Sequence, residues 1–219
     1  MDEEILLIDK PAGMSSFGVV ARVRRVLSQK AGKKVKVGHT GTLDPFATGL
    51  LILLTGKGTK KSNEFLKLDK KYEATIRLGK KSTTGDIEGE ITEVEGACEV
   101  SRERVREVVE SFQGKIKQRV PQYSAVKRNG ERAYKLARAG REVEMPVREI
   151  EVHKIEILDY KWPELKIGCH VSSGTYIRTL GEDIGEKLGV GGYLTALRRT
   201  EVGKYKVGDA VELEEFMLQ

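Results

Sequence analysis

Cysteine and histidine are scarce in this chain of 219 residues, which has two cysteines and three histidines. Cys98 and Cys169 lie far apart, so they provide neither a disulfide framework nor the close spacing of a metal site. The histidines stand singly at positions 39, 153 and 170. Because a metal site needs several such ligands together, we expect no bound metal.

Long apolar runs are also missing. No stretch approaches the roughly 20 residues that a membrane-spanning helix needs, and the chain starts with acidic residues, unlike a signal peptide. We therefore expect no membrane association and a cytoplasmic location. Hydrophobic residues still make up 39% of the chain, which is enough for the core of one large domain.

Signatures of cofactor enzymes and common hydrolases are absent. No G-x-G-x-x-G motif follows a predicted strand. The segment 55–60 fails the phosphate-loop pattern, because Gly58 rather than Ser or Thr follows Lys57. The chain also lacks a recognisable Ser/His/Asp set or a paired-carboxylate motif. We expect no cofactor.

Positive charge is present and unevenly distributed, with a net charge of +6. Residues 10–43 contain eight Lys or Arg residues and no acid, and residues 114–141 contain nine against the single acid Glu131. Two solvated basic helices would explain this pattern without any function. Because two separate segments share the bias, we favour a surface that binds nucleic acid.

The segment 38–50 is the least ordinary part of the chain. It combines three glycines, three threonines, His39 and Pro45 with Asp44, the sole acid between Lys10 and Lys57. An apolar run, residues 50–54, follows directly and predicts a buried strand. A structural turn is the alternative interpretation. A lone acid within a basic region favours a functional role for Asp44.

Periodicity predicts alternating strands and helices. We expect strands at residues 3–9, 71–79, 91–95, 149–160, 164–172 and 200–207, and helices from residues 17, 101, 172 and 213. Residues 118–147 form an irregular excursion with Tyr123, Tyr134 and a short helix closed by Gly140, which is either a nucleic-acid clamp or a structural excursion. Arg178 falls in a predicted first helical turn, where the helix dipole does not favour a cation. That conflict marks Arg178 as a functional candidate.

Six segments carry a resemblance to a known family: residues 9–16, 38–49, 71–74, 120–127, 173–180 and 193–199. In this order they resemble the TruB family of bacterial tRNA pseudouridine-55 synthases over nearly the whole chain. The resemblance implies a mixed α/β (α+β) fold with a central, largely antiparallel sheet, flanking helices and a basic thumb-like segment at 118–147. It implies one catalytic domain over residues 1–219. The family's usual C-terminal RNA-binding (PUA-type) domain is expected to be absent.

The resemblance also implies roles for particular residues. Asp44 matches the catalytic aspartate, Arg178 the arginine that pairs with it, and Tyr72 the tyrosine that stacks on the target base. Among residues that contact the substrate, Leu197 matches an apolar pocket contact and His39 the histidine that enters the T-loop. Lys10 is expected to brace the site and Tyr176 to pack beside Arg178.

The implied function is isomerisation of uridine to pseudouridine in the T-loop of tRNA, by an enzyme that flips the base out of its stack. The T-arm of tRNA is the expected partner, and we expect a monomer. Two alternatives stay open from the sequence: the same chemistry on ribosomal or messenger RNA, and a module that binds or folds RNA without catalysis.

Overall fold

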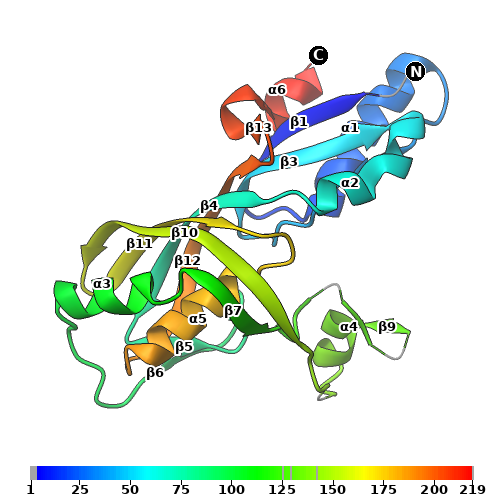
Figure 1. Ribbon diagram of the computed structural model, residues 1–219. Coiled ribbons are helices and arrows are strands. Elements are labelled where there is room, and N and C mark those ends of the chain that lie inside the picture. Colours follow the sequence, from blue (N-terminus) through cyan, green and yellow to red (C-terminus); the bar gives the residue numbers. More distant parts are fainter. Residues whose placement is uncertain (1–3, 125, 129, 142, 219) are drawn as a thin grey trace. The chain divides into compact units, whose positions relative to one another are not determined.

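The computed structural model describes residues 4–124, 126–128, 130–141 and 143–218 (Figure 1). The chain divides into two compact units. Unit 1 comprises residues 1–73 and 196–219, and unit 2 comprises residues 74–195. Strands β4 (Lys70–Leu78) and β12 (Gly192–Val202) each run from one unit into the other.

Unit 1 is built on strands in the order β14–β1–β3–β12, with β2 also paired to β3 and β13 to β12. Its strands are β1 (Ile5–Lys10), β2 (Val37–His39), β3 (Thr48–Thr55), β13 (Tyr205–Lys206) and β14 (Val211–Glu212), with parts of β4 and β12. Its helices are α1 (Ser16–Ala31), α2 (Ser62–Leu66), α6 (Leu213–Leu218) and the 3-10 turns η1 (Gly56–Lys61) and η2 (Val207–Asp209).

The core of unit 1 lies on both faces of β3. Alternate side chains of a strand point to opposite faces, so Leu51 and Leu53 pack with Val19 and Val23 of α1 and with α6. Leu50, Ile52 and Leu54 pack against Phe65 of α2 on the other face. The apolar run that predicts a buried strand is therefore buried on both sides, and this prediction is confirmed.

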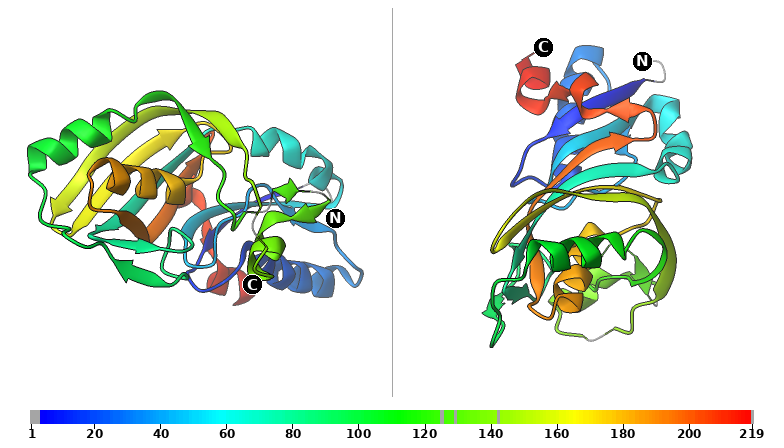
Figure 2. Two further views of the ribbon diagram at one scale, coloured as in Figure 1. Left: turned by 90° about the horizontal axis from the view of Figure 1, so that it is seen from below. Right: turned by 60° about the vertical axis from the view of Figure 1, so that its left-hand side comes forward.

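Unit 2 contains strands in the order β12–β4–β11–β10–β7. Its long hairpin joins β10 (Val147–Lys161) to β11 (Glu164–Val171), and β7 (Gly114–Arg119) pairs with β10. Helices α3 (Arg102–Glu110) and α5 (Ile177–Lys187) contact each other, and α3 contacts β10 and α5 contacts β7 (Figure 2). The remaining elements are β5 (Lys80–Ser82), β6 (Ile91–Glu93), β8 (Lys127–Arg128), β9 (Glu131–Arg132) and α4 (Ala133–Arg138).

Most element types agree with the sequence, but two predictions are wrong. The helix expected from residue 172 begins at Ile177, because Gly174 adopts a φ of 85° in a turn that Thr175 closes by donating to the Ser172 carbonyl. The single strand expected at 200–207 is instead a hairpin: β12 begins at Gly192 and ends at Val202, the chain turns at Gly203 with a φ of 54°, and β13 pairs back on β12. The first residues of β12 lack the alternation of a half-exposed strand, since residues 192–194 are all buried.

The short helix predicted in the excursion is confirmed as α4, and Gly140 follows it with a φ of 68°. Such a left-handed glycine ends a helix without strain. Among the helices of the described residues, none is long and apolar enough to span a membrane.

Candidate active site

Asp44 lies between β2 and β3, in a loop whose backbone is fixed on both sides of it. On one side, the Ser16 hydroxyl donates to the Leu43 carbonyl (2.9 Å) and accepts from the Leu43 amide (2.8 Å). On the other, the Pro45 carbonyl accepts from the amide of Gly13 at 2.9 Å. The Asp44 carbonyl itself accepts from the amide of Ala47 at 3.1 Å, which closes a turn. Asp44, which is half-buried, is thus carried on a rigid segment.

Lys10 adds a further contact to this loop. It ends β1 with a side chain that is 0% exposed, and its ammonium donates to the carbonyls of Pro11 (2.8 Å) and Pro45 (3.1 Å). Burying a cation is costly unless hydrogen bonds replace its water. These bonds agree with a bracing role for Lys10, and its contact with substrate stays a prediction.

The start of the loop is held from β12. The buried Arg199 donates to the carbonyls of Leu50 (2.8 Å) and Gly41 (3.1 Å). Gly49 makes this approach possible, because a Cβ there would lie 2.3 Å from the Arg199 carbonyl oxygen. Periodicity alone gave no indication of Arg199, although it ends one of the six family-like segments.

His39, at the end of β2, accepts a hydrogen bond at Nδ1 from the amide of Gly41, at 3.4 Å. This contact fits the structural alternative, in which the ring holds the turn. Tyr72 on β4 and Leu197 on β12 are both buried, with 8% and 7% exposure. Unit 1 therefore contains Lys10, His39, Asp44, Tyr72 and Leu197, and their roles toward a substrate stay predictions.

Unit 2 contains the second group of site residues, centred on Arg178 in the first turn of α5. Its buried guanidinium donates to the carbonyls of Thr84 and Tyr123, each at 2.7 Å, and lies 3.5 Å from the Asp86 carboxylate. These contacts explain how a cation is accommodated near a helix N-terminus. Since Asp44 and Arg178 belong to different units, their pairing stays a prediction.

Asp86 is a residue that the sequence interpretation missed. Its carboxylate accepts from the Thr84 hydroxyl (2.6 Å) and the Glu88 amide (2.9 Å), and its side chain is 3% exposed. The signal for it was the unexplained cation at position 178, which requires a buried acid as partner. Asp86 follows a polar turn containing Gly85, but its distance from Arg178 in the sequence hid the connection.

Tyr176 immediately precedes α5, and the Gln118 side chain forms hydrogen bonds with both its backbone amide and its backbone carbonyl. The Tyr176 amide donates to the Gln118 side chain at 2.8 Å, and that side chain donates back to the Tyr176 carbonyl at 3.0 Å. Tyr176 also packs on the apolar cluster of Val120, Ala133 and Met145. It therefore links the base of the excursion to the start of the helix that carries Arg178.

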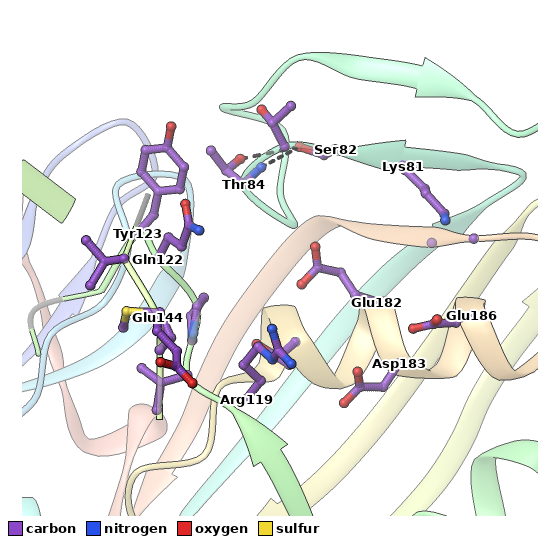
Figure 3. A pocket seen from close by; sticks show the side chains of 18 residues that line it. Lys81, Ser82, Thr84, Arg119, Gln122, Tyr123, Glu144, Glu182, Asp183 and Glu186 are labelled. Carbon is purple, nitrogen blue, oxygen red and sulfur yellow. Dashed lines mark hydrogen bonds between the residues drawn. The ribbon is translucent and has the colours of Figure 1, made fainter. Parts of the chain in front are cut away.

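A cavity of about 560 Å³ lies beside this assembly in unit 2 (Figure 3). Thr84 and Tyr123, whose carbonyls bind Arg178, line it, as do Glu182 and Asp183 of α5. Burial raises the pKa of Glu182 to about 7, with nearby acids adding to the shift and Arg178 opposing it. Burial, helped by Glu186, raises the pKa of Asp183 to about 6. Acidic side chains of α5 thus face this cavity, which Lys81 and Arg119 also line.

Comparison with models of protein families shows which family this chain belongs to. A family model described as the N-terminal domain of TruB family pseudouridylate synthases matches residues 24–177. The chain belongs to the TruB family. A second model, described as the tRNA pseudouridylate synthase B C-terminal domain, matches residues 178–218. The resemblance predicted from the six segments is confirmed.

Bacterial proteins named tRNA pseudouridine synthase B are similar to this TruB chain along nearly its whole length. The protein from Phocaeicola vulgatus is 45% identical over 214 residues, covering 97% of this chain and 91% of the relative. The one from Thermobifida fusca is 46% identical over 223 residues, covering 98% and 74%. The one from Nitrosococcus oceani is 44% identical over 211 residues, covering 96% and 67%.

Solved structures support the TruB assignment at the level of fold. A chain in a crystal structure of a Cbf5-Nop10-Gar1 complex is 29% identical with a TM-score of 0.74, and the match covers 97% of this chain and 53% of that one. A chain of an H/ACA RNP bound to a substrate RNA containing 2'-deoxyuridine is 27% identical with a TM-score of 0.70, covering 97% and 52%. This chain thus spans about half the length of those chains. The predicted mixed α/β fold with a largely antiparallel sheet is confirmed.

Proposed function

We propose that this TruB chain is an isomerase that converts uridine to pseudouridine in the T-loop of tRNA, at position 55, with Asp44 as the catalytic carboxylate. The single observation that carries the proposal is the loop of Asp44, whose backbone is hydrogen-bonded at Leu43, Asp44 and Pro45. A catalytic group must be held in one geometry to act efficiently. The names of the relatives from several bacteria support tRNA as the substrate.

The reaction rearranges one bond without net change of atoms. The bond between C1′ of the ribose and N1 of uracil breaks, the detached base turns, and C5 bonds to C1′. The proton on C5 leaves and N1 acquires one, so the product is an isomer of the substrate. Asp44 would assist detachment and return of the base, which must first leave its stack to reach a half-buried carboxylate.

The other predicted residues would surround the flipped base. Tyr72 would stack on it and accept the C5 proton, and Leu197 would supply an apolar contact. Arg178 would pair with Asp44 and favour its ionised form. His39 would occupy the space that the base leaves. Tyr176 and Lys10 would hold the backbone around these residues.

The basic segment 118–147 would clamp the T-arm, since each neutralised phosphate releases counterions and strengthens binding. We propose that residues 1–219 act as one catalytic domain. We also propose that the protein works as a monomer in the cytoplasm.

Replacing Asp44 with asparagine tests the proposal. We expect pseudouridine formation in tRNA, mapped by mass spectrometry, to fall by at least about 10³-fold, because the amide cannot replace an ionised carboxylate in catalysis. The matched control is Asp209→Asn, which removes an exposed acid of unit 1 and should leave the rate unchanged. Far-ultraviolet circular dichroism establishes that both variants are folded. Wild-type-like activity of Asp44→Asn would refute the catalytic assignment.

A further inference from the structure

The sequence places two serines side by side at the start of α1, and the structure gives them different tasks. Ser15 is the N-cap, and its hydroxyl accepts a hydrogen bond from the amide of Gly18 at 3.0 Å. Ser16 is the first residue of the helix and is 1% exposed. Because Ser15 already caps the helix, the Ser16 hydroxyl is available for another purpose.

That purpose is a double hydrogen bond to one residue of the Asp44 loop. The Ser16 hydroxyl donates to the Leu43 carbonyl at 2.9 Å and accepts from the Leu43 amide at 2.8 Å. Leu43 is 3% exposed, so water does not readily replace either bond. A single hydroxyl thus satisfies both backbone groups of the residue that precedes Asp44.

The two sides of Asp44 are held independently. Lys10 and Gly13 bind the carbonyl of Pro45, after Asp44, whereas Ser16 alone among the described contacts binds Leu43, before it. If the Leu43 bonds were lost, the loop would still be anchored by Arg199 at Gly41 and by Lys10 and Gly13 at Pro45. The residues between these two anchors could then shift and displace the Asp44 carboxylate without unfolding the loop.

We propose that Ser16 is a positioning residue that acts through Leu43 to set the Asp44 carboxylate for reaction, an inference that rests on the proposed function. Asp44 has two side-chain torsions, so fixing its backbone leaves the carboxylate a small volume to explore. A displacement of about 1 Å at a reacting group can reduce a rate by about 10²-fold. Ser16 would therefore control the rate of reaction and have little influence on the binding of tRNA.

The first test compares Ser16→Ala with Ser15→Ala. Both variants lose one hydroxyl near the start of the same helix, but only Ser16→Ala loses the bonds to Leu43. With enzyme in excess and saturating, we expect the single-turnover rate constant for pseudouridine formation to fall about 30- to 100-fold in Ser16→Ala and less than threefold in Ser15→Ala. The Kd for tRNA should change less than threefold in both.

This rate constant does not depend on the fraction of folded enzyme, so a purely structural role of Ser16 would leave it unchanged. Equal rate constants in the two variants would overturn the proposal. A loss of tRNA affinity as large as the loss of rate would also overturn it, because Ser16 would then shape the binding surface.

Amide hydrogen exchange tests the same contact without relying on activity. In Ser16→Ala we expect the Leu43 amide to exchange at least tenfold faster, while in Ser15→Ala it should exchange as in the wild type. Unchanged exchange in Ser16→Ala would overturn the proposal. A different outcome is also possible: the wild type does not convert uridine in tRNA, yet the Leu43 amide exchanges faster in Ser16→Ala. That result would refute the proposed function but retain the role of Ser16 in fixing the loop.

Discussion

The Asp44 loop of unit 1 and the Arg178 assembly of unit 2 are fixed by different kinds of interaction. Around Asp44, the contacts end on neutral backbone groups: Ser16 binds Leu43, Lys10 binds Pro45, and Arg199 binds Gly41. The Arg178 guanidinium, by contrast, contacts the buried carboxylate of Asp86 as well as two backbone carbonyls. Further acidic side chains line the cavity beside it.

Because of this difference, we expect the two groups of residues to respond differently to pH and to salt concentration. Neutral backbone acceptors do not titrate, so the geometry of the Asp44 loop should be constant over a wide pH range. Near Arg178, burial raises the pKa values of Glu182 and Asp183, so these groups respond to pH. The Arg178–Asp86 pair responds to the removal of either charge. We infer that the Asp44 loop is a rigid support whose contacts do not depend on a charge pair, whereas the stability of the Arg178 assembly depends on its charge state.

The largest effect is expected when the buried charge pair of unit 2 is broken. Asp86→Asn removes the negative charge beside Arg178 and should lower the free energy of unfolding, measured in urea, by about 3 kcal/mol, because an uncompensated buried cation is costly. Glu95→Gln, which removes an exposed acid of the same unit, should change it by less than about 0.5 kcal/mol. If Asp86→Asn and Glu95→Gln had the same free energy of unfolding, the negative charge of Asp86 would not stabilise the buried Arg178.

A smaller effect, without salt dependence, is expected in unit 1. Arg199→Lys replaces a planar fork with one ammonium, which cannot reach the carbonyls of both Leu50 and Gly41 as the fork does. We expect unfolding free energy to fall by about 1–2 kcal/mol, equally at low and high sodium chloride. Lys206→Arg, at an exposed position of β13, serves as the control and should be neutral. A strong salt dependence for Arg199→Lys would remove the contrast between the units.

The smallest effect concerns Glu182. Its pKa is raised from an ordinary 4.5 to about 7, so the folded state binds more protons than the unfolded state between these values. The wild type should therefore lose stability as pH rises from 4.5 to 7, and Glu182→Gln should remove this loss. Since Glu182 is partly exposed, solvent screening limits the gain to about 1 kcal/mol at pH 8.

Urea unfolding of Glu182→Gln at pH 5 and pH 8 measures this difference. Glu110→Gln, an exposed change on α3, should show the same offset from wild type at both pH values. A pH-independent offset for Glu182→Gln as well would mean that burial does not perturb this carboxyl group.

Much of the fold could be predicted from the sequence, because the elements carry strong local patterns. The apolar run 50–54, the apolar periodicity after residue 101 and Gly140 after α4 each produced the expected element. The start of α5 and the extent of β12 could not be predicted. The α5 start depends on a turn at Gly174 and on Gln118, which binds Tyr176 from 58 residues away.

The candidate site divides in the same way. Asp44 and Arg178 each stood out locally, one as a lone acid and the other as a cation at an unfavourable helical position. Asp86, Ser16 and Arg199 did not, because an acid in a turn, a serine before a helix and an arginine in a strand are ordinary in themselves. Only their contacts in the folded structure identify these three residues as parts of the candidate site.

The sequence by itself determined the family, the basic character of two segments and the types of most elements, since these depend on residue order and local periodicity. Only the tertiary structure decided which polar groups meet. The Ser16 hydroxyl reaches Leu43 across 27 positions and Arg178 reaches the Thr84 carbonyl across 94. A buried donor must find an acceptor, but the sequence does not state which of many acceptors folding will bring within about 3 Å.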